Sequence, residues 1–171
     1  MAPGSHRPRK HQVIGWREDV ALPELAIGHI KAKIDTGART TALHAEDVEE
    51  FWRYGHRWVR FLTPPYHGQD CEPVSARVVD RRAIKNTSGI PQMRIVIHTI
   101  LVLGNRHWGI DVSLTDRKEM GFDLILGRTA VRRHGLLVDP GRSYLIGPPK
   151  AELISSLNLS PPDTTGQGKP A

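Results

Sequence analysis

The stretch that decides the fold is His29-Ile30-Lys31-Ala32-Lys33-Ile34-Asp35-Thr36-Gly37-Ala38. Polar and apolar residues alternate over its first six positions, which predicts a half-buried β-strand. The strand ends in a turn where Gly37 permits a tight bend and leaves room for another chain to approach. A carboxylate in a rigid turn beside small residues suits a general base. Asp-Thr-Gly is also an ordinary turn sequence, so this stretch alone leaves a structural and a catalytic role for Asp35 open.

Turn residues divide much of the chain into short strand-forming runs. Alternating or β-branched residues predict strands over residues 74–82, 93–103, 108–114 and 122–126. Gly104-Asn105 suits a two-residue hairpin turn between two of these runs. Arg128 to His134, ended by Gly135, is the best helix candidate. The sequence therefore predicts a mostly β fold with one short α-helix.

Two further segments have a distinctive composition. The polar tip Asn86-Thr87-Ser88-Gly89 separates two strand-forming arms, which together predict a long projecting hairpin. The insertion Ala45 to Tyr66 is rich in aromatic residues. Because these residues lack the spacing of one sheet face, we interpret the insertion as a layer over the core rather than a nucleobase-stacking platform.

Composition narrows the class of protein. The chain has 171 residues, 39% apolar and 25% charged, which suits one domain with a real core and excludes collagen-like or wholly disordered chains. Its net charge is +6, from 24 Lys and Arg against 18 Asp and Glu. Because the basic residues are spread along the chain, a solvated surface is favoured over a nucleic-acid interface. An acidic peptide or small anionic substrate would use the same charge.

The apolar runs, the chain ends and the cysteine content indicate the domain boundaries and the cellular compartment. No apolar run is long enough to cross a bilayer, and the basic N-terminus lacks the apolar stretch of a secretory signal. The single cysteine, Cys71, excludes an intramolecular disulfide and a cysteine-built metal site, and it suits the reducing cytoplasm. We expect a flexible basic tail over residues 1–11, a folded domain over 12–147 and a flexible tail over 148–171.

A second motif, Leu124-Ile125-Leu126-Gly127-Arg128, leads directly into the predicted helix. The chain thus has a strand, an Asp-Thr-Gly turn, β-hairpins, an apolar-apolar-Gly strand and a helix, in that order. In these residues it resembles the retropepsin-like aspartic proteases. The resemblance implies the closed β-barrel lobe of an acid protease, with Asn86 to Gly89 in the position of the flap.

A narrower resemblance is to the bacterial and archaeal family catalogued as ATP-dependent zinc proteases, which are retropepsin-like and often associated with RimK-type ATP-grasp ligases. It covers about Val13 to Leu145. The similar blocks are residues 31–44, 82–89, 116–121, 126–130 and 137–145. Several blocks in the right order make this resemblance specific.

The resemblance implies roles for individual residues. The catalytic carboxylate would be Asp35, held in a turn formed with Thr36, Gly37 and Ala38. The residues expected to bind substrate or to form the flap are Arg39, Lys85, Asn86, Thr87, Ser88, Gly89 and Arg128. The chain departs from the retroviral enzymes in two ways: Arg39 stands where they carry an acid, and the flap tip is not glycine-rich.

The chemistry of an aspartic protease requires two carboxylates that share one proton. This chain contains one Asp-Thr-Gly. A homodimer that places two Asp35 residues across a two-fold axis is therefore expected, with the active site at the interface.

The expected function is that of an aspartic endopeptidase acting on a peptide or protein, and the association with RimK-type ligases makes a glutamate-rich substrate reasonable. The alternative is a non-catalytic binding or regulatory module beside an ATP-grasp ligase, and a metal-dependent peptidase is third. His44, His98 and His107 would be the metal ligands to consider, but His-Glu-x-x-His and phosphate-loop motifs are absent. We expect no metal and no cofactor, so any ATP requirement would come from a partner.

Overall fold

The fold is built almost entirely from strands. The computed structural model describes residues 10–64 and 72–157, so Cys71 and most of both predicted tails lie outside the described residues. The elements are β1 (Gln12–Gly15), β2 (Arg17–Leu22), a 3₁₀ turn (Pro23–Leu25), β3 (Ile27–Asp35), β4 (Thr41–His44), β5 (Glu46–Arg53), β6 (His56–Leu62), β7 (Val74–Lys85), β8 (Pro91–Leu103), β9 (Arg106–Thr115), β10 (Leu124–Gly127), α1 (Arg128–Val131), β11 (Leu136–Asp139) and α2 (Ala151–Leu157).

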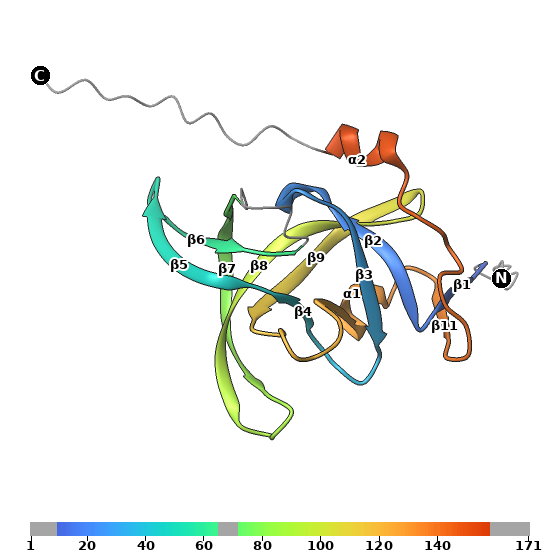
Figure 1. The fold of residues 1–171 in the computed structure, drawn as a ribbon, viewed down its shortest axis with the longest axis horizontal. Helices are drawn as coiled ribbons and strands as arrows, with labels where there is room; N and C mark the ends of the chain where they lie inside the picture. Colours follow the sequence, from blue (N-terminus) through green and yellow to red (C-terminus); the bar gives the residue numbers. More distant parts are fainter. Residues whose placement is uncertain (1–9, 65–71, 158–171) are drawn as a thin grey trace, which may run out of the picture.

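Nine strands form one large sheet in the order β2-β3-β10-β4-β9-β8-β7-β6-β5. An additional pairing between β2 and β8, at Ala21 and Val102, joins the first strand of this order to the sixth and closes six strands into a ring. β7, β6 and β5 continue outward from the ring and curve over one side of the molecule (Figure 1). β1 and β11 form a separate parallel pair. This architecture confirms the mostly β fold expected from the sequence.

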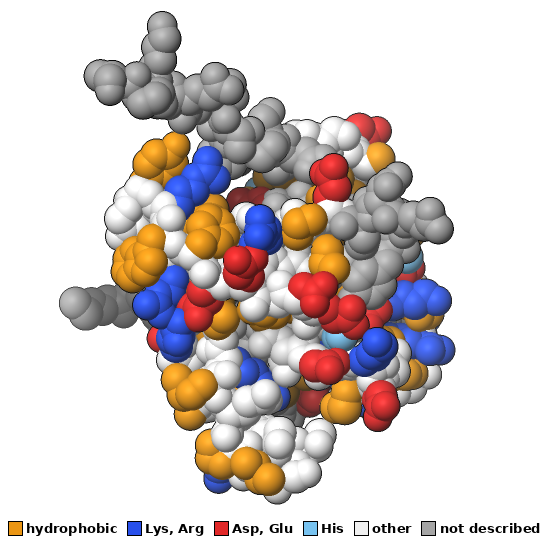
Figure 2. Space-filling view, turned by 60° about the vertical axis from the view of Figure 1, so that its left-hand side comes forward, with side chains coloured by type: hydrophobic (Ala, Val, Ile, Leu, Met, Phe, Trp, Pro, Cys, Tyr) orange, Lys and Arg blue, Asp and Glu red, His pale blue; other side chains and the backbone are white. Residues whose placement is uncertain are grey.

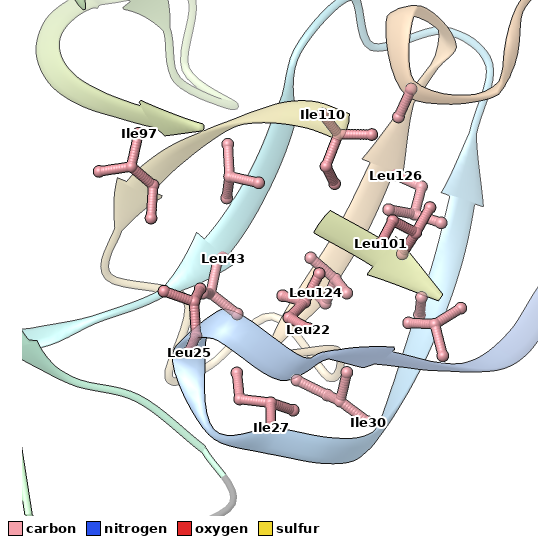
Figure 3. Packing of buried hydrophobic residues seen from close by; sticks show 14 of the residues in the cluster. Leu22, Leu25, Ile27, Ile30, Leu43, Ile97, Leu101, Ile110, Leu124 and Leu126 are labelled. Carbon is pink, nitrogen blue, oxygen red and sulfur yellow. The ribbon is translucent and has the colours of Figure 1, made fainter. Parts of the chain in front are cut away.

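The ring encloses the hydrophobic core. Alternation along β3 works as predicted, because Ile30, Ala32 and Ile34 are buried whereas Lys31 and Lys33 are exposed. Side chains from neighbouring strands meet them inside the ring, as Figure 3 shows for Leu22, Leu25, Ile27, Ile30, Leu43, Ile97, Leu101, Ile110, Leu124 and Leu126. Each fully buried Leu or Ile side chain contributes about 1.5–3 kcal/mol, so the ring is a stable frame for the turn that follows β3.

The long hairpin predicted around residues 86–89 is present as β7 and β8. Asn86 caps its tip, since Oδ1 accepts hydrogen bonds from the N–H groups of Ser88 (3.0 Å) and Ile90 (2.9 Å). Gly89 completes the turn with φ +75°, a conformation that favours glycine. The hairpin projects at the end of the molecule where β3 stops (Figure 1).

The C-terminal part differs from expectation in two respects. α1 ends at Val131 rather than His134, because Arg132 is extended and Arg133 takes a left-handed φ of +70°. The structure also adds α2, within residues that the sequence analysis assigned to a flexible tail. Among the described residues, no helix combines the length and apolar character needed to cross a membrane.

The aromatic insertion covers the core only in part. Phe61 of β6 is fully buried, but Trp52 and Tyr54 at the other end of the β5–β6 hairpin are 68% and 78% exposed. Arg57 lies over Trp52 and Arg53 over Tyr54. On this side of the molecule, acidic and basic side chains are intermixed with exposed hydrophobic ones (Figure 2).

Candidate active site

Asp35 is the last residue of β3 and begins a tight turn. Its Oδ1 accepts hydrogen bonds from the backbone N–H groups of Gly37 (3.1 Å) and Ala38 (3.0 Å). These two bonds fix the orientation of the half-buried carboxylate. No hydrogen bond joins Oδ2 to any residue in the described part of the chain, so this oxygen is available to a water molecule or a substrate.

β10 supports the turn from one side. β10 runs parallel to β3, with Leu126 beside Ile34 and Gly127 beside Asp35. A Cβ on Gly127 would lie 2.6 Å from the backbone carbon of Thr40. Only glycine therefore allows the chain after the Asp35 turn to pass this close. The N–H of Gly127 also donates to Oγ1 of the buried Thr41 (3.1 Å).

The start of α1 supports the turn from below. Arg128 donates from its backbone N–H to the carbonyl of Ala38 (2.8 Å) and from Nη1 to the carbonyl of Gly37 (3.1 Å). Thr129 Oγ1 donates to the carbonyl of Arg39 (2.7 Å). Arg128, predicted as a substrate-binding or flap residue, thus contacts the Asp35 turn itself. Thr36, a central residue of the turn, is exposed.

A cavity of about 700 Å³ lies between the residues that follow the turn and the part of the β7–β8 hairpin close to its tip. Its walls come from five parts of the chain: Arg39 and Thr40, Arg82 to Ile84 in β7, His98 in β8, Gly109 to Asp111 in β9, and Thr129 with Arg132 at α1. Of the residues predicted to bind substrate, Arg39 lines this cavity. Lys85 and Asn86 to Gly89 lie beyond it, along the hairpin toward its tip.

Two arginines near the site were not singled out from the sequence. Burial lowers the pKa of Arg117, the positive charge of Arg94 lowers it further, and the charges of Asp123 and Asp35 oppose this change. Burial also lowers the pKa of Arg94, whose buried Nε has no hydrogen-bond partner in the described residues. Arg117 belonged to a recognised block, but nothing in the sequence around Arg94 distinguished it.

The three histidines considered as metal ligands have different surroundings. Nδ1 of the buried His44 accepts the N–H of Arg117 (2.8 Å), and its Nε2 lies 3.1 Å from Glu46 Oε1. His98 pairs with Asp111 (3.0 Å), and His107 is exposed. Across residues 10–64 and 72–157, no three His, Cys, Asp or Glu side chains are grouped so that they could hold a metal ion.

An Asp-Thr-Gly turn on a barrel strand, braced by a parallel apolar-Gly strand and a short helix, defines a retropepsin-like lobe. A model of the RimB-like family, described as "Retropepsin-like aspartic endopeptidase RimB", matches residues 13–149. The chain belongs to this family. The finer name that the sequence suggested, ATP-dependent zinc protease, is not part of this description and stays a prediction.

Curated relatives carry a different name. The chain is 39% identical over 140 residues to a "Probable alpha-L-glutamate ligase" of Shewanella pealeana, a match that covers 79% of this chain and 30% of the relative. It is 38% identical over 138 residues to a protein of the same name from Desulfotalea psychrophila, covering 80% and 30%. The chain therefore spans about a third of the length of these relatives.

A solved structure has the same fold. Lpg0085 of Legionella pneumophila, a protein of unknown function, matches with a TM-score of 0.67 and 28% sequence identity over 78% of this chain and 97% of that one. The similarity extends over nearly the whole of the solved Legionella chain.

Proposed function

We propose that this chain is an aspartic endopeptidase that works as a homodimer, with Asp35 as its catalytic residue. The observation that carries the proposal is the state of the Asp35 carboxylate: Oδ1 is held by two backbone N–H groups, and Oδ2 is free of hydrogen bonds from the described residues. A carboxylate fixed in this way is oriented for a water molecule before substrate arrives.

The dimer follows from the number of carboxylates. One chain brings one Asp-Thr-Gly turn, and the reaction needs two carboxylates that share a proton. A second copy placed across a two-fold axis supplies the other Asp35. The exposure of Thr36, which directly follows Asp35 within the turn, supports a contact between the two turns.

In the proposed reaction, the ionised Asp35 takes a proton from the water molecule as the water oxygen attacks the peptide carbonyl carbon. The protonated Asp35 of the second copy donates its proton to the carbonyl oxygen. A tetrahedral diol forms with no net change in charge. The first Asp35, now protonated, gives its proton to the nitrogen as the C–N bond breaks. The second Asp35, now ionised, takes a proton from a hydroxyl of the diol, so that an amine and a carboxylic acid are released and both carboxyl groups return to their starting states. Asn86 to Gly89 would close over the substrate as a flap, and Lys85 would flank it.

Acidic peptides, glutamate-rich ones above all, are the proposed substrates. Arg39 follows the turn with no acidic partner in the described residues, and Arg94 and Arg117 lie buried or half-buried near the site. Buried guanidinium groups are favourable places for a carboxylate. The relatives' name, alpha-L-glutamate ligase, supports the same substrate, because a ligase and a peptidase would act on the same kind of peptide.

A second candidate is a non-catalytic module that assists an ATP-grasp ligase. It is favoured by the length of the relatives, in which the region similar to this chain accounts for about 30%. Such a partner is compatible with catalysis by Asp35 as well. Metal-dependent hydrolysis remains third, and the cytoplasmic location remains a prediction.

The deciding experiment compares the parent chain with Asp35→Asn on a mixed library of acidic peptides across a wide pH range. We expect cleavage by the parent and a loss of several orders of magnitude in the variant, with both chains melting alike. Asp47→Asn, a change at an exposed position, is the matched control. Equal cleavage by Asp35→Asn would refute catalysis by Asp35, and no cleavage by the parent would favour the module.

A further inference from the structure

We propose that the cavity beside the Asp35 turn is a subsite that holds a glutamate side chain of the substrate through Arg39 and Arg132. The inference rests on the proposed peptidase function and assigns to it two specificity-determining residues. Arg132 had no role in the sequence analysis, and tertiary structure alone brings it to the same cavity as Arg39.

The wall formed by the turn and α1 carries the positive charge that is not neutralised. Arg39 is held at its backbone, where its carbonyl accepts hydrogen bonds from Oγ1 (2.7 Å) and N–H (3.3 Å) of Thr129. Arg132 is fixed through its N–H, which donates to the carbonyl of Arg128 (2.9 Å). Neither guanidinium forms an ion pair or a hydrogen bond with a described residue. In both residues the backbone is therefore held in place, whereas the guanidinium group remains available to a ligand.

On the opposite wall, Arg82 and His98 are already engaged by acidic side chains. Arg82 donates from Nε to Asp80 (2.6 Å) and from Nη2 to Asp111 (3.2 Å). The other oxygen of Asp111 lies 3.0 Å from Nδ1 of His98. Because Arg82 is already paired with Asp80 and Asp111, Arg39 and Arg132 are the lining arginines that have no acidic partner among the described residues and can attract an incoming carboxylate.

The shape and lining of the cavity suit glutamate. Its volume of about 700 Å³ admits a side chain together with water, within the usual range of ligand pockets. Ile84 and Ile110 supply apolar surface beside the charged groups, where the two methylene groups of a glutamate can pack. The carboxylate then reaches the guanidinium groups, which bind it by charge-assisted hydrogen bonds.

The cavity lies beside the Asp35 turn, so it would receive a side chain next to the scissile bond. Arg39 is four residues beyond Asp35, so a peptide lying over the Asp35 turn would place a neighbouring side chain, rather than the reacting carbonyl, in the cavity. One wall belongs to the residues after the turn and the other includes the end of β7 close to the hairpin tip, so a bound glutamate would link the two.

The test measures kcat/KM for an acidic peptide and for a set in which each glutamate in turn is replaced by glutamine. The chains are the parent, Arg39→Gln, Arg132→Gln, the double variant, and the control Arg133→Gln, which alters an exposed neighbour outside the cavity. At one peptide position, replacing glutamate by glutamine should lower the kcat/KM of the parent and of the control by about tenfold or more, as expected when a charged hydrogen bond is lost. The double variant should cleave the glutamate and glutamine peptides of that position with nearly equal kcat/KM.

A binding measurement separates this inference from the proposed function. Calorimetry with hexaglutamate and hexaglutamine on Asp35→Asn chains does not depend on cleavage. We expect the Asp35→Asn chain to prefer hexaglutamate, and we expect this preference to disappear when Arg39→Gln and Arg132→Gln are added to it. That result would support the subsite even if the parent cleaves nothing. Equal binding of the two peptides by the Asp35→Asn chain, or an undiminished preference after both arginine substitutions, overturns it.

Discussion

Gly127 lies directly beside Asp35 in the parallel pairing of β10 with β3. The two residues are 92 positions apart in the sequence, and the pairing brings the start of α1 under the Asp35 turn. Because Gly127 has no side chain, the backbone of Thr40 passes within a distance that a Cβ would not permit. The position of the Asp35 turn therefore depends on a residue far from it in the chain.

Gly127→Ala should destabilise the protein by about 1–3 kcal/mol, the usual cost of forcing an atom into a closely packed site. The new Cβ would meet the backbone of Thr40 at 2.6 Å, and backbone yields less readily than a side chain. Urea unfolding measures the change. Gly28→Ala is the control, since nothing lies within 4 Å of a Cβ there. Equal stability of Gly127→Ala and the parent would contradict this packing.

The active species should be a dimer of the 19.1-kDa chain. Because each copy brings one Asp35, specific activity should fall on dilution as the dimer dissociates. Sedimentation equilibrium and an activity titration over the same concentrations test this directly. A monomer that retains full activity per chain would contradict the shared active site.

The hairpin tip should become ordered when a peptide binds. Without a peptide, residues 86–89 are held by hydrogen bonds of the tip itself, such as that from Gly89 N–H to the carbonyl of Asn86 (2.9 Å). We expect their amides to exchange quickly in the free protein and slowly with hexaglutamate bound to Asp35→Asn. The amides of Gly104 and Asn105, at the other end of β8, serve as a control. Equal exchange with and without peptide would argue against a flap.

Stability should fall on acidification partly through His134, which stacks on Trp108 with ring centroids 4.3 Å apart. Burial lowers the pKa of His134, and the charge of Arg106 lowers it further. The unfolded chain therefore takes up a proton near pH 6.5 that the folded chain resists. The contribution of His134 is present above that pH and is lost as the pH falls toward the folded-state value.

Urea unfolding of the parent and His134→Phe between pH 7.5 and 5 measures this contribution. The phenyl ring can keep the stacking on Trp108 and has no proton to bind, so stability should decline less steeply in the variant. Histidines common to both chains cancel in the comparison. If the free energy of unfolding declines equally in both chains, His134 does not contribute to the pH dependence of stability.

Peptide cleavage should persist after chelation and nucleotide removal. The motivation is the sequence, which lacks a phosphate loop and a His-Glu-x-x-His motif, together with the described residues, in which no cluster of three ligating side chains occurs. Activity is measured before and after treatment with a chelator and exhaustive desalting. Loss of cleavage that zinc alone restores would revive the metal-dependent alternative, with His44 as the first residue to examine.

Local sequence was sufficient for the features that depend on neighbouring residues. The alternation of β3, the Asp35 turn, the hairpin turn at Gly104-Asn105 and the tip at Asn86 to Gly89 were all predicted. Backbone preference and hydrogen bonds between nearby residues determine each of them. The resemblance in ordered motifs added the fold class, which the family match confirms.

Tertiary structure decided how these pieces meet. The pairing of β1 with β11, the approach of Gly127 to Thr40 and the cavity shared by Arg39 and Arg132 each join segments that are far apart in the chain. No local pattern encodes such contacts, because their free energy comes from burying the apolar faces of all the strands together. The sequence by itself determined the Asp35 turn, and only the packing of the strands determined which charged side chains surround it.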